Sequence, residues 1–68
     1  MKIDKAKFDR LLYLKALNYT ELAELAGVQV MTISKMANGK TTPRAATLRK
    51  ITKVLDCQPV DILEEVKA

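Results

Sequence analysis

The chain has 68 residues, of which 49% are apolar and three are aromatic. A chain of this length forms one domain with one modest core, so we expect residues 1–68 to be a single domain without a separate catalytic or effector domain. Twelve Lys and Arg against eight Asp and Glu give a net charge of +4, which favours a polyanionic partner without identifying it. Because aromatic residues are few, we expect a core of Leu, Ile, Val, Ala and Met, which is typical of an all-α fold.

The charges are unevenly distributed along the chain, which predicts a molecule with a basic side. Basic residues crowd the middle at Lys35, Lys40, Arg44, Arg49 and Lys50, and acidic residues cluster near the end at Asp56, Asp61, Glu64 and Glu65.

Cysteine usage and the first segment indicate where the protein works. The one cysteine, Cys57, cannot form an intrachain disulfide or a four-ligand Cys or Cys/His metal site, and we expect it to be a small packed residue rather than a redox sensor. Charged residues interrupt the first 17 positions every few residues, unlike a signal peptide or a membrane span. We therefore expect a soluble cytoplasmic protein with no membrane partner, no cofactor and no bound metal.

Helical spacing and capping signals predict three helices in the first half of the chain. Residues 4–16 carry apolar residues at helical spacing. Asn18 followed by Glu21 has the pattern of a capping box, which begins a second helix over residues 19–25. Gly27 supplies the positive φ that the chain needs to enter a third helix, over residues 30–37, which Asn38 and Gly39 end.

Two prolines mark the beginnings of two further helices. Pro43 has a φ that suits the start of a fourth helix, which runs to residue 55, where Asp56 tolerates a left-handed end. Pro59 begins a short fifth helix with Asp61 near its N-terminus. The apolar residues of this last segment either cover the core or form a dimer seam, and they are Ile62, Leu63 and Val66.

The most specific pattern lies in residues 19–38. Its inward residues form the shared core of two helices joined by a tight turn, and they are Leu22, Ala23, Ala26, Gly27, Val28, Ile33 and Met36. Ala23 is small enough for the two helices to approach closely, and Gly27 allows the turn. The remaining positions at the start and on the outer face of the third helix are Gln29, Val30, Met31, Thr32 and Lys35.

The stretch 11–63 resembles the Cro and phage-repressor type of helix-turn-helix domain, the xenobiotic-response-element family. The matching segments are Leu22-Ala23, Gly27-Val28, Ile33-Ser34, Asn38-Gly39-Lys40 and Pro59-Val60-Asp61-Ile62-Leu63. This resemblance implies a five-helix, lambda-repressor-like domain that binds a pseudo-palindromic double-stranded DNA operator as a homodimer. It also implies a nucleoid-associated transcriptional regulator, and small size favours a repressor.

The resemblance assigns two sets of DNA contacts. Base edges are expected to meet Gln29, Val30, Met31, Thr32 and Lys35. The sugar-phosphate backbone is expected to meet Asn18, Tyr19, Asn38, Lys40 and Arg44.

The chain departs from the family pattern at three places. Val30 and Met31 offer only apolar contact, for instance to thymine methyl groups, where relatives often carry polar residues. Tyr19 replaces a common Gln. Many relatives pair an Arg with a Glu where this chain has Leu12 and Ala37, and we interpret the exchange as a Leu-Ala contact in place of a buried ion pair.

The sequence also bears on functions other than DNA binding. Catalysis is not expected, because the chain has no His and no phosphate-binding Gly-rich loop, and its one serine, Ser34, has no candidate base nearby. No small-molecule substrate is evident. The alternative is a protein-interaction module of helix-turn-helix shape, an antitoxin-like or anti-repressor partner, which Val30 and Met31 would serve.

The N-terminal lysines are either a DNA-binding arm or solvated charges, and they are Lys2, Lys5 and Lys7.

Overall fold

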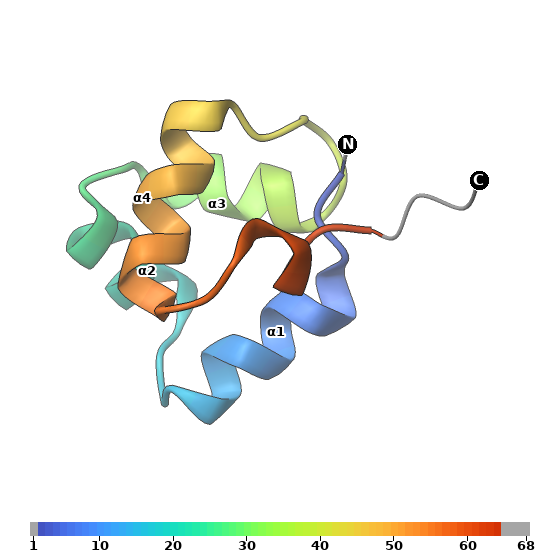
Figure 1. Ribbon diagram of the computed structural model, residues 1–68. Helices are drawn as coiled ribbons and strands as arrows, with labels where there is room; N and C mark the ends of the chain where they lie inside the picture. The colour runs from blue at the N-terminus through green and yellow to red at the C-terminus, as the bar shows by residue number, and fades with distance from the viewer. Residues whose placement is uncertain (1, 65–68) are drawn as a thin grey trace.

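The computed structural model describes residues 2–64, which form four α-helices and one 3-10 turn around a single core (Figure 1). The elements in chain order are α1 (Lys5–Leu14), α2 (Tyr19–Ala26), α3 (Val30–Ala37), α4 (Ala45–Leu55) and η1 (Pro59–Asp61). Helix α4 packs on α2 and η1, and α2 packs on α3. No helix within residues 2–64 is long and apolar enough to span a membrane.

The capping signals in the sequence begin the first two helices. The Asp4 side chain accepts a hydrogen bond from the Lys7 amide and caps α1. At α2, the Asn18 side chain accepts from the Glu21 amide at 2.8 Å while the Glu21 carboxylate accepts from the Asn18 amide at 3.2 Å. This reciprocal pair is the predicted capping box, and it satisfies two backbone donors at the helix start.

All four α-helices end in the same way. A residue with left-handed φ follows each helix, and these residues are Ala16, Gly27, Gly39 and Asp56. The next amide then donates to the carbonyl five residues back, in the pairs Leu17 to Leu12, Val28 to Ala23, Lys40 to Lys35 and Cys57 to Thr52. This Schellman motif satisfies carbonyls that the helix leaves free and turns the chain sharply, which allows four helices to pack within 35 × 22 × 18 Å.

Ala16 is the residue least suited to its place in this repeated motif. Its φ is 56°, and a left-handed conformation costs a residue with a Cβ about 1–2 kcal/mol. We expect Ala16→Gly to raise the free energy of unfolding by about 0.5–1 kcal/mol, because glycine removes that strain at some cost in chain entropy. Urea denaturation measures the change. Ala6→Gly, at an exposed position within α1, is the matched control and is expected to lower stability; stabilisation by both changes would contradict this reasoning.

The second half of the chain differs in part from the predicted five helices. Helix α4 begins at Ala45 with Arg44 as its N-cap, so Pro43 lies just before the helix rather than in its first turn. After Asp56, Pro59 begins the single 3-10 turn η1, because Ile62 has already left the helical conformation at φ −124°. The fifth α-helix is therefore not present within residues 2–64, and Val66 lies outside the described residues.

The core is apolar and draws on all four α-helices and on the segments before α1 and after η1. Its buried residues are Ile3, Phe8, Leu12, Leu22, Ala23, Ile33, Met36, Ala37, Ile51, Leu55, Ile62 and Leu63. Leu12 and Ala37 are 3% and 2% exposed and belong to this one cluster, as expected if an apolar contact stands in place of an ion pair. Ile62 and Leu63 are also buried in it, so these two cover the core and do not form a dimer seam.

The first and last described segments lie side by side (Figure 1). Ile3 and Leu63 form an antiparallel bridge, the Asp4 amide donates to the Ile62 carbonyl, and the Glu64 amide donates to the Lys2 carbonyl. The Lys7 Nζ also donates to the Leu63 carbonyl at 3.3 Å. The segment before α1 is thus held on the domain, which argues against the alternative of a free DNA-binding arm.

Candidate nucleic-acid interface

Helix α3 divides cleanly into a buried and an exposed face. Ile33, Met36 and Ala37 point into the core and are at most 2% exposed. On the other face, Val30 and Met31 are 43% and 60% exposed, although both are apolar. Gln29 stands at the N-cap but makes no capping hydrogen bond with its side chain, so its amide group remains available. The helix thus presents the predicted residues to the outside from a rigid, well-packed base.

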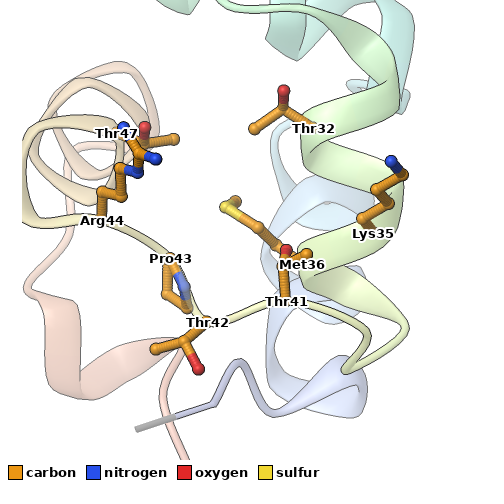
Figure 2. A pocket seen from close by; sticks show the side chains of 8 residues that line it. All are labelled: Thr32, Lys35, Met36, Thr41, Thr42, Pro43, Arg44 and Thr47. Carbon is orange, nitrogen blue, oxygen red and sulfur yellow. The ribbon is translucent and has the colours of Figure 1, made fainter.

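A groove lies beside this face, between α3 and the loop that leads into α4 (Figure 2). It has a volume of about 460 Å³. Its lining residues are Thr32, Lys35, Met36, Thr41, Thr42, Pro43, Arg44 and Thr47.

The groove combines positive charge with hydroxyl groups. Figure 2 shows Thr32 pointing from α3 toward the α4 side, where Arg44 and Thr47 lie, while Lys35 lies at the opposite edge of α3. The lining contains two cations and four threonine hydroxyls but, within residues 2–64, no carboxylate. Cations and neutral donors without competing acids suit phosphate and base edges.

The groove brings together residues that the sequence predicted separately. Thr32 and Lys35 were expected to meet bases and Arg44 to meet the backbone, and all three line one surface. The groove also contains three threonines that were not predicted from the sequence, Thr41, Thr42 and Thr47. Nothing in the spacing of the sequence marks them, because the course of the loop after α3 decides which of its side chains face the groove.

The two ends of the helix-turn-helix carry the other predicted backbone contacts. Asn18 is exposed and uses its Oδ1 in the capping box, which leaves its Nδ2 group as a donor for another acceptor. Asn38 donates through Nδ2 to the Ser34 carbonyl at 2.8 Å, which fixes its side chain against α3. Lys40 is exposed, and its amide closes the α3 end motif on the Lys35 carbonyl.

Tyr19 makes an internal contact that the sequence analysis did not include. Its hydroxyl donates to Asp9 Oδ1 at 2.6 Å, and its ring packs on Phe8 with centroids 5.8 Å apart. The Lys5 Nζ forms an ion pair with the other carboxylate oxygen, Asp9 Oδ2, at 2.8 Å. Since phosphate oxygens only accept hydrogen bonds, Tyr19 could donate to phosphate only by leaving Asp9. Tyr19 thus differs from Asn38, which also donates within the chain but keeps a second amide hydrogen for another acceptor.

This network lowers the pKa of Asp9 and raises the pKa values of Tyr19 and Lys5. Burial raises the pKa of Asp9, but the hydrogen bonds from Lys5 and Tyr19 and the charge of Lys5 outweigh burial, so the pKa lies below its ordinary value. Burial raises the pKa of Tyr19, and the hydrogen bond and charge of Asp9 raise it further. The folded protein therefore favours an ionised Asp9 beside a protonated Tyr19.

We expect Tyr19→Phe to lower the free energy of unfolding by about 1 kcal/mol near neutral pH, because it removes one hydrogen bond to a carboxylate. A lowered pKa for Asp9 stabilises the fold above the ordinary carboxyl pKa, and this contribution is lost as pH falls through the folded value. A raised pKa for Tyr19 has the opposite sign, and its contribution is lost as pH rises through the folded value. The deficit of the variant should therefore shrink at both extremes of pH.

Chemical denaturation of both proteins over a series of pH values measures this deficit. Tyr13→Phe is the matched control, because Tyr13 is 84% exposed and should tolerate the change at every pH. A Tyr19→Phe deficit that stayed constant down to acidic pH would show that the hydroxyl does not act through Asp9.

Three comparisons relate this geometry to known proteins. The family model for the Cro/C1-type HTH DNA-binding domain matches residues 7–68. The chain is 42% identical over 57 residues to the HTH-type transcriptional regulator YozG of Bacillus subtilis (strain 168), covering 82% of this chain and 68% of that protein. The crystal structure of a transcriptional regulator from Listeria innocua has the same fold, with a TM-score of 0.74 at 20% identity over all of this chain.

The likeness to the Listeria protein covers 64% of that longer chain and concerns the fold alone. The family match and the Bacillus relative rest on sequence, and they include the helix-turn-helix and the groove beside α3. The chain therefore belongs to the Cro/C1-type helix-turn-helix family of DNA-binding domains, whose relative in Bacillus is named as a transcriptional regulator.

Proposed function

We propose that this protein is a transcriptional repressor that binds a pseudo-palindromic operator in double-stranded DNA as a homodimer. It works in the cytoplasm on the nucleoid and has no catalytic role. The observation that carries the proposal is the exposed face of α3 beside a groove with two cations and no carboxylate among its described lining residues. A helix presented in this way fits the major groove of B-DNA, while cations at its border neutralise phosphates.

Different residues on the exposed face of α3 contact different bases. Gln29 pairs with adenine and Lys35 with guanine, because an amide and an ammonium match the hydrogen-bonding edges of those bases. Thr32 supplies a hydroxyl, and the exposed apolar pair Val30 and Met31 meets thymine methyl groups. This combination favours an operator half-site of mixed composition.

Phosphate contacts hold the helix in register. Lys40 and Arg44 supply charge from the loop after α3 and from the N-cap of α4. Asn18 and Asn38 supply amide groups from the start of α2 and the end of α3. Such contacts carry affinity and salt dependence but little sequence information.

A protein-interaction module is the second candidate, because Val30 and Met31 expose apolar surface at one place. A dry protein interface is depleted of lysine, whereas the exposed Lys35 lies one turn from Met31 on the same helix and Lys40 follows the end of that helix. Salt separates the two candidates, since phosphate contacts release counterions and an apolar interface does not.

Selection from a random pool of DNA duplexes tests the proposal, with the affinity of the selected duplex then measured at rising salt. We expect an enriched palindrome whose half-sites lie about one helical turn apart, with affinity that falls steeply as salt rises. Absence of enrichment, or binding indifferent to salt, would favour the protein-interaction module.

A further inference from the structure

A second groove lies on the surface between α1 and η1. Its lining residues are Lys7, Arg10, Leu11, Leu14, Val60 and Asp61, and its volume is about 480 Å³. None of them lines the groove beside α3, so the two surfaces are separate. We call this second surface the α1–η1 groove.

Apolar side chains from both walls are exposed in the α1–η1 groove. Leu14 is 64% exposed on the α1 side and Val60 is 65% exposed on the η1 side, with the half-buried Leu11 beside them. Helix α1 contributes Lys7, Arg10, Leu11 and Leu14 to the groove. Their spacing of three and four residues places them on one face of the helix. Two large aliphatic side chains from distant parts of the sequence thus remain uncovered at one place.

The walls of the groove are rigid before any partner binds. At η1, the Gln58 amide donates to Asp61 Oδ2 at 2.8 Å and the Asp61 amide donates back to the Gln58 carbonyl at 2.9 Å. The residues directly after η1 are buried in the core, and Leu63 is bridged to Ile3 next to the start of α1. A preformed surface of this kind loses little entropy on binding.

The groove carries opposite charges on its two walls. Arg10 is exposed on α1 and Asp61 is exposed on η1, and within residues 2–64 neither has an ion-pair partner in its own chain. Asp61 Oδ1 remains able to accept a hydrogen bond, because the cap uses Oδ2. A surface with a cation on one wall and an anion on the other is complementary to itself under a two-fold rotation.

We propose that a second copy of this chain binds at the α1–η1 groove and forms an isologous dimer. The rotation places Arg10 of each copy against Asp61 of the other, while Leu14 and Val60 pack across the seam. This inference rests on the homodimer of the proposed function and names its interface. Because the groove beside α3 shares no residue with the seam, both copies keep it open for DNA.

Charge reversal on each wall tests the interface by sedimentation velocity without DNA. In Arg10→Asp, each ion pair becomes two carboxylates, and in Asp61→Arg it becomes two cations. Each variant alone is expected to self-associate about tenfold more weakly or worse than the unchanged chain. An equimolar mixture of the two variants should restore dimers, because every contact across the seam then joins an Asp to an Arg.

Matched controls separate the interface from general effects of charge and folding. Lys53→Asp makes the same charge change in a different groove, beside Leu25 and Lys50, and should leave self-association unchanged. Thermal melting verifies that each variant folds. Should Asp61→Arg disturb the cap of η1, Asp61→Asn keeps a side-chain acceptor while removing the charge, and it is expected to weaken the dimer as well.

The interface would be overturned by a chain that stays monomeric as concentration rises, or by a dimer that neither Arg10→Asp nor Asp61→Asn weakens. Failure to recover dimers in the mixture of folded variants would also overturn it. A monomeric chain that still selects a DNA half-site would remove this interface and leave DNA reading by α3 intact. A dimer that selects no DNA would leave this interface intact and remove DNA reading by α3.

Discussion

Replacing Leu12 with Arg is expected to lower the free energy of unfolding by about 3–5 kcal/mol, because it buries a charge without a partner. Leu12 is 3% exposed and lies in a cluster made only of apolar side chains. A single core in a domain of this size supplies about 3–5 kcal/mol in total. The Leu12→Arg variant should therefore be largely unfolded at room temperature, as judged by circular dichroism and thermal melting.

The double variant shows whether Leu12 and Ala37 stand where relatives place an ion pair. Ala37→Glu alone should also unfold the domain, because Ala37 is 2% exposed in the same cluster. Leu12→Arg combined with Ala37→Glu should recover much of the lost stability if the new charges meet. An unchanged melting temperature for Leu12→Arg would show that its side chain escapes to solvent and that the proposed Leu-Ala contact contributes little.

Lys35→Ala is expected to weaken binding to the selected operator by about 1–3 kcal/mol and to relax the sequence preference at one position of each half-site. Lys35 is exposed at the outer edge of α3 and borders the groove beside this helix, so its ammonium is placed for a base edge. Fluorescence anisotropy with the operator and with single-position variants of it measures both effects.

Two further variants are measured beside Lys35→Ala for comparison. Lys40→Ala removes a charge placed for phosphate, so it should weaken all duplexes alike and flatten the salt dependence by about one counterion. Lys15→Ala is the matched control. Lys15 is exposed at the C-cap of α1 and does not line the groove beside α3. If Lys35→Ala left the preferred sequence unchanged, α3 would not be the base-reading helix.

Local chemistry accounts for most of what the sequence predicted correctly. The Asn18–Glu21 capping box, the left-handed Gly27 and the bounds of α3 each depend on residues a few positions apart. Such interactions between near neighbours favour the observed local conformation, and the packing of the core agrees with it.

Features that depend on tertiary packing were the ones that escaped prediction. Alanine has no preference for left-handed φ, so Ala16 gave no sign that α1 ends at Leu14 rather than two residues later. The segment after Pro59 has helical spacing but leaves the helix at Ile62, where its backbone and side chain join Asp4 and the core. The hydrogen bond from Tyr19 to Asp9 joins two helices, and no spacing along the chain indicates it.

The bridge between Ile3 and Leu63 has a consequence for synthesis on the ribosome. Ile3 is made well before Leu63, and both are buried in the shared core. A nascent chain can form its helix-turn-helix early, but the core stays open on one side until Leu63 has left the exit tunnel. A chain that stalls before Leu63 has emerged therefore leaves the apolar side chains of α1 open to chaperones and proteases.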